Sequence, residues 1–228
     1  MSIAENYQKV RKEIPENVSI VLAAKTRTKD EILQAINAGA TDIGENYVQE
    51  AFQIYNMLGE SAQKIRWHMI GTLQKNKINK ALSIFDVIQT VDSINKAQAI
   101  DKRVKTAGKK GIPVYIEINI GSEITKAGVK PEYALVENLA REISKLNHIY
   151  VEGLMTMGPR VGNPEKIRPY FKKTKDIFDK LKSLSLPNVN MKTLSMGMSN
   201  SYKIAIEEGS NMVRLGTIIF GMRKCLLQ

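Results

Sequence analysis

The chain has 228 residues, little more than the roughly 100–200 of a typical domain, so we expect a single domain over residues 1–228. Hydrophobic residues make up 43% of it and charged residues 25%, which excludes a mostly disordered, collagen-like or membrane-spanning protein. The formal charge of +11 is compatible with binding to anionic ligands or to nucleic acids.

The predicted elements alternate short β-branched runs with longer amphipathic stretches, which is typical of repeated βα units around a parallel sheet. A helix over 2–12 comes first. Eight apolar runs then predict strands over 18–24, 41–44, 65–70, 86–91, 112–120, 149–155, 191–196 and 212–215. The clearest helical patterns between them cover 29–38, which ends at Gly39, then 94–107, 163–184 and 201–208.

These elements favour a single (β/α)8 TIM barrel with an extra N-terminal helix. Dividing 228 residues among eight units gives about 28 residues each, close to what a barrel of roughly 250 residues needs. An open dinucleotide-binding sheet is the alternative, but no G-x-G-x-x-G turn follows the first predicted strand.

A barrel carries its chemistry on the loops that follow the carboxyl ends of its strands, and the first such loop begins with Lys25. If the Lys25 amine emerges from the barrel interior, burial lowers its pKa and increases the neutral fraction that attacks aldehydes and ketones. The alternative is a lysine that reaches from the strand end to water.

The seventh and eighth strand ends supply the parts of a phosphate site, which barrels often build there. Gly197 lets the backbone approach an anion, and Ser199 is predicted to cap the helix over 201–208. Gly216 and Thr217 add a second small turn with hydrogen-bond donors. The alternative is an ordinary strand–turn–helix junction.

Arg214 lies two residues before this second turn, so its guanidinium is placed to face a ligand anchored there. The alternative is an ion pair with Glu117 or Glu45. His68 has no partner at metal-ligand spacing, and we expect a hydrogen-bonded barrel histidine and no metal site. No catalytic triad, paired glycosidase carboxylates or P-loop is present.

The distribution of the positive charge indicates a surface without a specific binding role. The two ends of the chain indicate a reducing cellular compartment. The basic windows 102–110 and 166–182 lie on helical patterns, which indicates solvated helix faces. No nucleic-acid recognition motif accompanies them. The start of the chain lacks the order of a signal peptide, and the single cysteine, Cys225, cannot form an internal disulfide. We expect a cytoplasmic protein without membrane or nucleic-acid partners.

Taken together, the motifs resemble the pyridoxal phosphate homeostasis proteins, relatives of the N-terminal barrel of alanine racemase, over almost the whole chain. The resemblance rests on LAAKTRT at 22–28, GENYVQE at 44–50, WHMIGTLQKNK at 67–77, LSMGMS at 194–199 and MVRLGTIIFGMR at 212–223. It implies a fold-type III barrel that binds pyridoxal 5'-phosphate. Small departures, Ala23-Ala24 before the lysine and Ile43 before GEN, concern local packing.

The resemblance also implies roles for individual residues. Lys25 corresponds to the lysine that holds the cofactor as a Schiff base, and Asn46 to a residue beside the cofactor ring. Ser199, Gly216 and Thr217 fall on the phosphate-binding positions, and Arg214 on the arginine that faces the pyridine nitrogen. Because arginine stays protonated, it disfavours a pyridinium and weakens the cofactor as an electron sink.

The implied function is therefore to hold and hand over pyridoxal phosphate in vitamin B6 and amino-acid homeostasis, with PLP-requiring apoenzymes as recipients and no catalytic residue of its own. The first alternative is a PLP-dependent amino-acid racemase. Its activity would be low, because the chain leaves no residues for the second domain of a racemase. A Schiff-base aldolase without cofactor is another alternative. We expect a monomer. A second cofactor site near Lys75 and Lys77 is left open.

Overall fold

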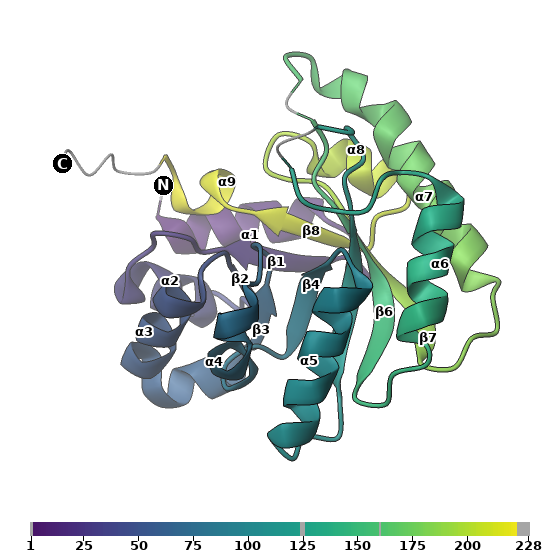
Figure 1. Ribbon diagram of the computed structural model, residues 1–228. Coiled ribbons are helices and arrows are strands. Elements are labelled where there is room, and N and C mark those ends of the chain that lie inside the picture. Colours follow the sequence, from purple (N-terminus) through teal and green to yellow (C-terminus); the bar gives the residue numbers. More distant parts are fainter. Residues whose placement is uncertain (1, 124–125, 160, 223–228) are drawn as a thin grey trace.

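The computed structural model describes residues 2–123, 126–159 and 161–222, which form a closed barrel of eight parallel strands surrounded by helices (Figure 1). Each strand pairs with its neighbours in chain order, and β8 pairs with β1 to close the barrel. The prediction of a TIM barrel is confirmed. Cys225 lies outside the described residues.

The strands occupy the predicted apolar runs, with ends that differ by no more than two residues. They are β1 (Ser19–Ala23), β2 (Asp42–Glu45), β3 (Arg66–Met69), β4 (Val87–Val91), β5 (Ile112–Ile118), β6 (Ile149–Thr156), β7 (Val189–Ser195) and β8 (Met212–Leu215). The short runs of Val and Ile form strands because branched side chains pack well on a pleated surface and lose rotamer freedom in helices.

The helices lie on the outside of the barrel (Figure 1). They are α1 (Ile3–Glu13), α2 (Lys29–Asn37), α3 (Val48–Leu58), α4 (Ile78–Leu82), α5 (Ile94–Thr106), α6 (Tyr133–Ile143), α7 (Arg168–Lys182), α8 (Tyr202–Glu207) and α9 (Thr217–Phe220). The extra helix α1 begins with a capping box, in which Ser2 and Glu5 bind each other's backbone N–H, and it buries Tyr7 and Val10.

The stretch predicted as one helix over 163–184 differs at its start. A 3₁₀ turn, η3 (Pro164–Ile167), comes first, with Asn163 accepting a hydrogen bond from the Glu165 amide. Helix α7 begins only at Arg168. Pro164 is the first residue of the 3₁₀ turn and Pro169 the second residue of α7, positions whose N–H groups have no helical partner, so proline is tolerated at both starts.

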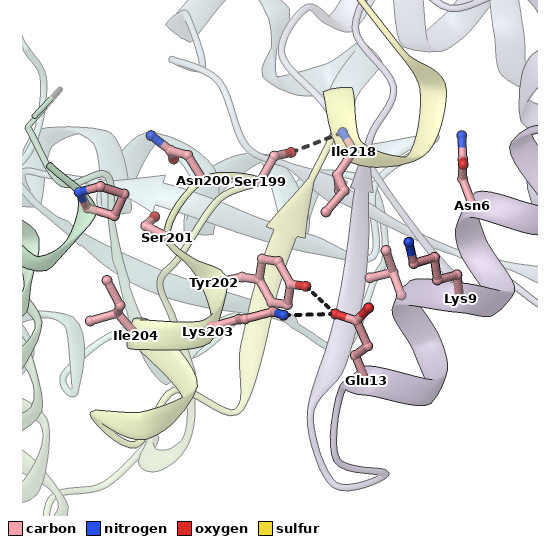
Figure 2. Close-up of a pocket in the computed structure, with 12 residues that line it drawn as sticks. Asn6, Lys9, Glu13, Ser199, Asn200, Ser201, Tyr202, Lys203, Ile204 and Ile218 are labelled. Carbon is pink, nitrogen blue, oxygen red and sulfur yellow. Dashed lines mark hydrogen bonds and ion pairs between the residues drawn. The ribbon is translucent and has the colours of Figure 1, made fainter. Parts of the chain in front are cut away.

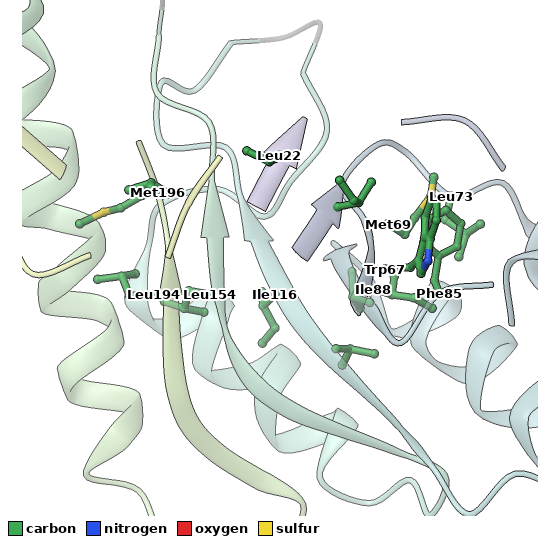
Figure 3. Close-up of a cluster of buried hydrophobic side chains, with 14 of the residues drawn as sticks. Leu22, Trp67, Met69, Leu73, Phe85, Ile88, Ile116, Leu154, Leu194 and Met196 are labelled. Atoms are coloured by element: carbon green, nitrogen blue, oxygen red, sulfur yellow. The ribbon is translucent and has the colours of Figure 1, made fainter. Parts of the chain in front are cut away.

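The apolar side chains form two layers. A larger layer between strands and helices includes Leu22, Trp67 and Phe85 (Figure 3). A smaller layer fills the barrel interior, with Val21, Val87, Tyr115, Met155 and Met212. The interior also contains buried polar side chains, and these lead to the site. In the described part of the chain, no helix combines the length and apolar character needed to cross a bilayer.

Candidate functional site

Strand register brings the six candidate residues to one end of the barrel. Strand β1 lies between β8 and β2, with Leu22 opposite Leu215 on one side and Ala23 opposite Gly44 on the other. The chain segments that follow these strands carry Lys25, Asn46 and the turn at Gly216. Strand β7, beside β8, leads into the turn with Ser199. The residues therefore lie at the mouth of the barrel, the space at the carboxyl ends of β7, β8, β1 and β2.

Lys25 lies at the rim of this space. The strand ends at Ala23, so the Lys25 side chain starts from the loop, and it is half-buried. Its Nζ donates a hydrogen bond to the Tyr47 hydroxyl at 3.2 Å and lies 4.7 Å from the centre of that ring, which is 53% exposed. The amine therefore lies against an exposed tyrosine at the rim, which agrees with the alternative of a lysine that reaches from the strand end to water.

Asn46 is held by a close approach between two loops. Gly71, which follows β3, packs against the Asn46 backbone so tightly that a Cβ at Gly71 would lie 2.3 Å from the Asn46 carbonyl oxygen. A cavity of about 330 Å³ opens here, and its lining includes Asn46, Tyr47, Gly71 and Lys77. Of the two lysines considered for a second site, Lys77 lines this cavity.

Ser199 joins the two turns predicted to bind phosphate. Its Oγ accepts hydrogen bonds from the backbone N–H of Gly216 at 3.2 Å and of Ile218 at 3.4 Å. The prediction that Ser199 caps α8 is wrong, because the N-cap is Ser201, two residues later. Thr217 is exposed. Ser199, Gly216 and Thr217 thus form one cluster of hydroxyl and N–H groups.

A larger cavity, about 570 Å³, borders this cluster on the outside of the barrel between α1 and α8. Figure 2 shows Ser199 and Ile218 at one end of it, and Glu13 bound to Tyr202 and Lys203 at the other. Neither Lys25 nor Arg214 lines this cavity. Ser199 therefore lies between the cavity and the β8 turn.

Arg214 is inside the barrel, only 4% exposed. One guanidinium nitrogen, Nη1, donates to the Ser195 carbonyl at 3.0 Å and to its Oγ at 2.7 Å, and Nη2 donates to the Thr156 carbonyl at 2.7 Å. Burial lowers the pKa of Arg214 to about 10, so the group remains a cation at neutral pH.

The ion pair considered for Arg214 does not form. Within the described residues the Arg214 guanidinium donates to the uncharged acceptors of Ser195 and Thr156, and it forms no ion pair with Glu117 or Glu45. Glu117 points its Oε2 into the barrel without a partner among the described groups and is 4% exposed. Burial raises the pKa of Glu117 to about 7. Sequence reasoning gave it no role beyond that pair, although a carboxyl within the apolar run of β5 was the available signal.

His68 is a hydrogen-bonded barrel histidine, as predicted. Its Nε2 lies 2.8 Å from the Asp42 carboxylate and its Nδ1 lies 2.9 Å from the Gln89 side-chain nitrogen. Burial lowers the pKa of His68, which keeps the ring neutral at neutral pH. Among the described residues, no group of three or more histidine, cysteine or acidic side chains is arranged to hold a metal ion.

This arrangement suits a phosphorylated aldehyde with an aromatic ring. The Lys25 amine is of the kind that reacts with an aldehyde, the N–H and O–H groups at Ser199 and Gly216 are of the kind that bind a phosphate, and the Arg214 cation is of the kind that donates to a ring acceptor.

Comparison with known proteins agrees with this chemistry. The family model described as the alanine racemase N-terminal domain matches residues 1–224. A relative from Aquifex aeolicus is 41% identical over 92% of this chain and 89% of its own length, and one from Haemophilus influenzae is 38% identical over 90% and 85%. Both are named pyridoxal phosphate homeostasis protein.

The chain belongs to the pyridoxal phosphate homeostasis protein family. Solved structures of that type superimpose closely: PipY of Synechococcus elongatus without PLP is 30% identical, with a TM-score of 0.89 over 96% of this chain and 100% of its own. The same protein with PLP bound gives 29% and 0.86 over the same shares. Alanine racemase of Clostridium difficile, 18% identical with a TM-score of 0.77 over 99% of this chain and 58% of its own, shares the fold.

Proposed function

We propose that this member of the pyridoxal phosphate homeostasis protein family binds pyridoxal 5'-phosphate on Lys25 and takes part in the homeostasis of vitamin B6 and amino acids in the cytoplasm. When bound, the cofactor would supply an aldehyde with which the Lys25 amine would condense, forming a C=N bond and releasing water, and an incoming amine would replace Lys25 in that bond and free its amine. The observation that carries the proposal is that Lys25, Arg214 and the Ser199–Gly216 turn all lie at the carboxyl ends of the adjacent strands β7, β8 and β1.

The donor set fits the parts of the cofactor. Uncharged hydroxyl and N–H groups at Ser199, Gly216 and Thr217 are suited to the phosphate, because each offers a hydrogen bond to a phosphate oxygen. Asn46 would lie beside the ring. Arg214 would face the ring nitrogen with an N–H donor, and it is itself held by Ser195 and Thr156.

Arg214 is also the reason for proposing a carrier rather than a strong enzyme. A guanidinium that stays charged repels a second proton at the ring nitrogen, so the ring withdraws electrons less strongly from a neighbouring carbon. Weak amino-acid racemisation is the second candidate function, and the shared fold with alanine racemase favours it. We propose that the protein acts as a monomer and passes the cofactor to PLP-requiring apoenzymes.

Titration of the purified protein with pyridoxal phosphate tests the proposed function. We expect a visible absorption band that saturates at one cofactor per chain, and amino-acid racemisation far below ordinary enzyme turnover, which is about 10 per second. Turnover at ordinary rates would overturn the carrier role in favour of the racemase. A protein that stays colourless would overturn cofactor binding and favour the aldolase alternative.

Replacing Gly71 with alanine is expected to weaken pyridoxal phosphate binding by roughly tenfold, the equivalent of about 1.4 kcal/mol. The new Cβ would lie 2.3 Å from the Asn46 carbonyl oxygen, so the loop that carries Asn46 must move away from the ring. The same titration measures this loss. Gly162→Ala is the matched control, because a Cβ there meets nothing within 4 Å. Equal affinities in both variants would contradict a role for the Asn46 loop.

A further inference from the structure

A continuous line of hydrogen bonds crosses the barrel interior from Arg214. Arg214 Nη1 lies 2.7 Å from Ser195 Oγ, which lies 2.8 Å from Gln89 Oε1. Gln89 Nε2 lies 2.9 Å from His68 Nδ1, and His68 Nε2 lies 2.8 Å from the Asp42 carboxylate. We refer to Ser195, Gln89, His68 and Asp42 as the interior relay.

The relay is shielded from water along most of its length. Ser195, Gln89 and His68 are each 0% exposed, and the Asp42 side chain is 13% exposed. Its members come from β7, β4, β3 and β2, so the bond between Ser195 and Gln89 crosses the barrel between strands that are not neighbours. Polar groups in such an interior cost free energy unless they are fully hydrogen-bonded. The unbroken line of hydrogen bonds therefore indicates a structural role.

The donors of the relay all point the same way. Arginine has no acceptor, so Ser195 Oγ accepts from Arg214 and its own O–H donates to Gln89 Oε1. The amide nitrogen of Gln89 therefore donates to His68 Nδ1, and His68 carries its single proton on Nε2, where it donates to Asp42. Thr41 Oγ1 donates to the other Asp42 oxygen at 2.6 Å.

The charges at the two ends agree with this direction. Arg214 is a cation at the cofactor end. At the other end burial disfavours the Asp42 carboxylate, but hydrogen bonds from His68 and Thr41 outweigh it and lower the pKa of Asp42. The dipoles of the serine, the amide and the imidazole thus lie head to tail between a cation and an anion, an arrangement in which each bond strengthens the next.

We propose that the interior relay positions Arg214, holding its guanidinium through Ser195 Oγ, whose own proton is directed to Gln89. Ser195 contacts Arg214 directly, and Gln89, His68 and Asp42 act through Ser195. The proposal rests on the proposed function, because it assigns the purpose of the relay to the ring-facing arginine.

Two substitutions of Gln89 separate positioning from simple packing. Gln89→Met keeps the size but removes the hydrogen bonds to Ser195 and His68, so Ser195 Oγ loses its acceptor and only the Ser195 and Thr156 carbonyls still hold Arg214 firmly. We expect pyridoxal phosphate to bind about tenfold more weakly and the visible band of the bound cofactor to shift. Gln89→Glu keeps an acceptor for Ser195 and places a carboxylate at His68 Nδ1. We expect it to make His68 doubly protonated and to bind the cofactor within about threefold of the wild type.

Nitrogen NMR of histidine-labelled protein reads the relay directly, because the chain has only 2 histidines and His148→Gln assigns the other signal. We expect His68 to be neutral with its proton on Nε2 in the wild type, and an imidazolium in Gln89→Glu. A proton on Nδ1, or a ring that averages between tautomers, would overturn the relay. This measurement needs no Gln89 variant to fold.

The binding measurements complete the test. Wild-type affinity and an unshifted band in a folded Gln89→Met variant would overturn the positioning role even with the expected tautomer. If the wild type does not bind pyridoxal phosphate, the proposed function fails and the positioning role falls with it, whereas the tautomer of His68 still decides whether the relay exists. The two failures are therefore distinguishable.

Discussion

Replacing Lys25 with alanine is expected to abolish covalent attachment of pyridoxal phosphate and with it the visible absorption band. Covalent attachment needs an amine near the other cofactor-binding groups, and Lys25 follows β1, the strand that pairs with the Arg214 strand β8. Borohydride reduction of the wild-type complex followed by peptide mapping should find the pyridoxyl group on Lys25. The effect is the largest expected of a single substitution, because alanine offers no group that can form the bond.

Two further variants make the result specific. Lys25→Arg retains a cation beside the Tyr47 hydroxyl but cannot form the C=N bond, so it should also lose the band. Lys77→Ala removes a lysine that lines the neighbouring cavity and should keep the band. Labelling chiefly at another lysine in the wild type, or a normal band in Lys25→Ala, would refute the assignment of Lys25.

The fold could be predicted from sequence because each unit carries its own signal. A short β-branched run followed by an amphipathic stretch predicts a strand and a helix, and repetition of this pair leaves few architectures other than a barrel. The prediction and the structure differ where a short segment is compatible with two local conformations. Asn163 and Pro164 are suited to a helix start as well as to the 3₁₀ turn that they form, and only packing against the barrel decides between them.

The site was predictable in part, because position after a strand identifies residues at the mouth but not their partners. Lys25 was predicted from its place after β1 and Arg214 from its place near the end of β8. The partners of Arg214 were not, since a charged residue suggests a carboxylate, whereas the structure supplies the Ser195 and Thr156 carbonyls. The bond between Ser195 and Gln89 joins residues 106 positions apart, which no local pattern reveals.

The surplus of positive charge is consistent with the expected solvated helix faces. On α7, Lys175 pairs with Asp179 and Lys180 pairs with Asp176, each one turn apart and with exposed partners. Such pairs contribute little to stability, typically below about 1 kcal/mol. Ionisable groups in the interior behave differently, because folding changes their pKa and thereby makes the free energy of unfolding depend on pH.

Glu45 is the group in which that consequence should be greatest. It is 1% exposed, and its Oε2 and that of Glu50 are buried without hydrogen-bond partners among the described groups. Burial, with the nearby Glu50 carboxylate, raises the pKa of Glu45 from its ordinary 4.5 to about 8. In the folded protein Glu45 is therefore protonated at neutral pH, whereas in the unfolded chain it is ionised.

The sign of the effect follows from proton binding. Between the two pKa values the folded state holds a proton that the unfolded state has lost, so the free energy of unfolding falls as pH rises. The contribution is fully present below pH 4.5 and is lost progressively up to about pH 8. Its full size is roughly 5 kcal/mol, because each pH unit between the two values is worth about 1.4 kcal/mol.

Replacing Glu45 with glutamine is expected to remove this loss, since an amide does not ionise. Urea unfolding at about pH 5 and about pH 8.5 should show that the variant gains roughly 4 kcal/mol relative to the wild type at the higher pH. Part of the wild-type slope should remain in the variant, because the pKa of Glu117 is raised to about 7 as well. Glu60→Gln, which alters an exposed carboxyl on the turn after α3, should leave the pH dependence unchanged. A Glu45→Gln variant that differs from the wild type by the same amount at both pH values would show that Glu45 is ionised in the folded barrel, and its charge would then need a partner that the buried space around Glu50 does not offer.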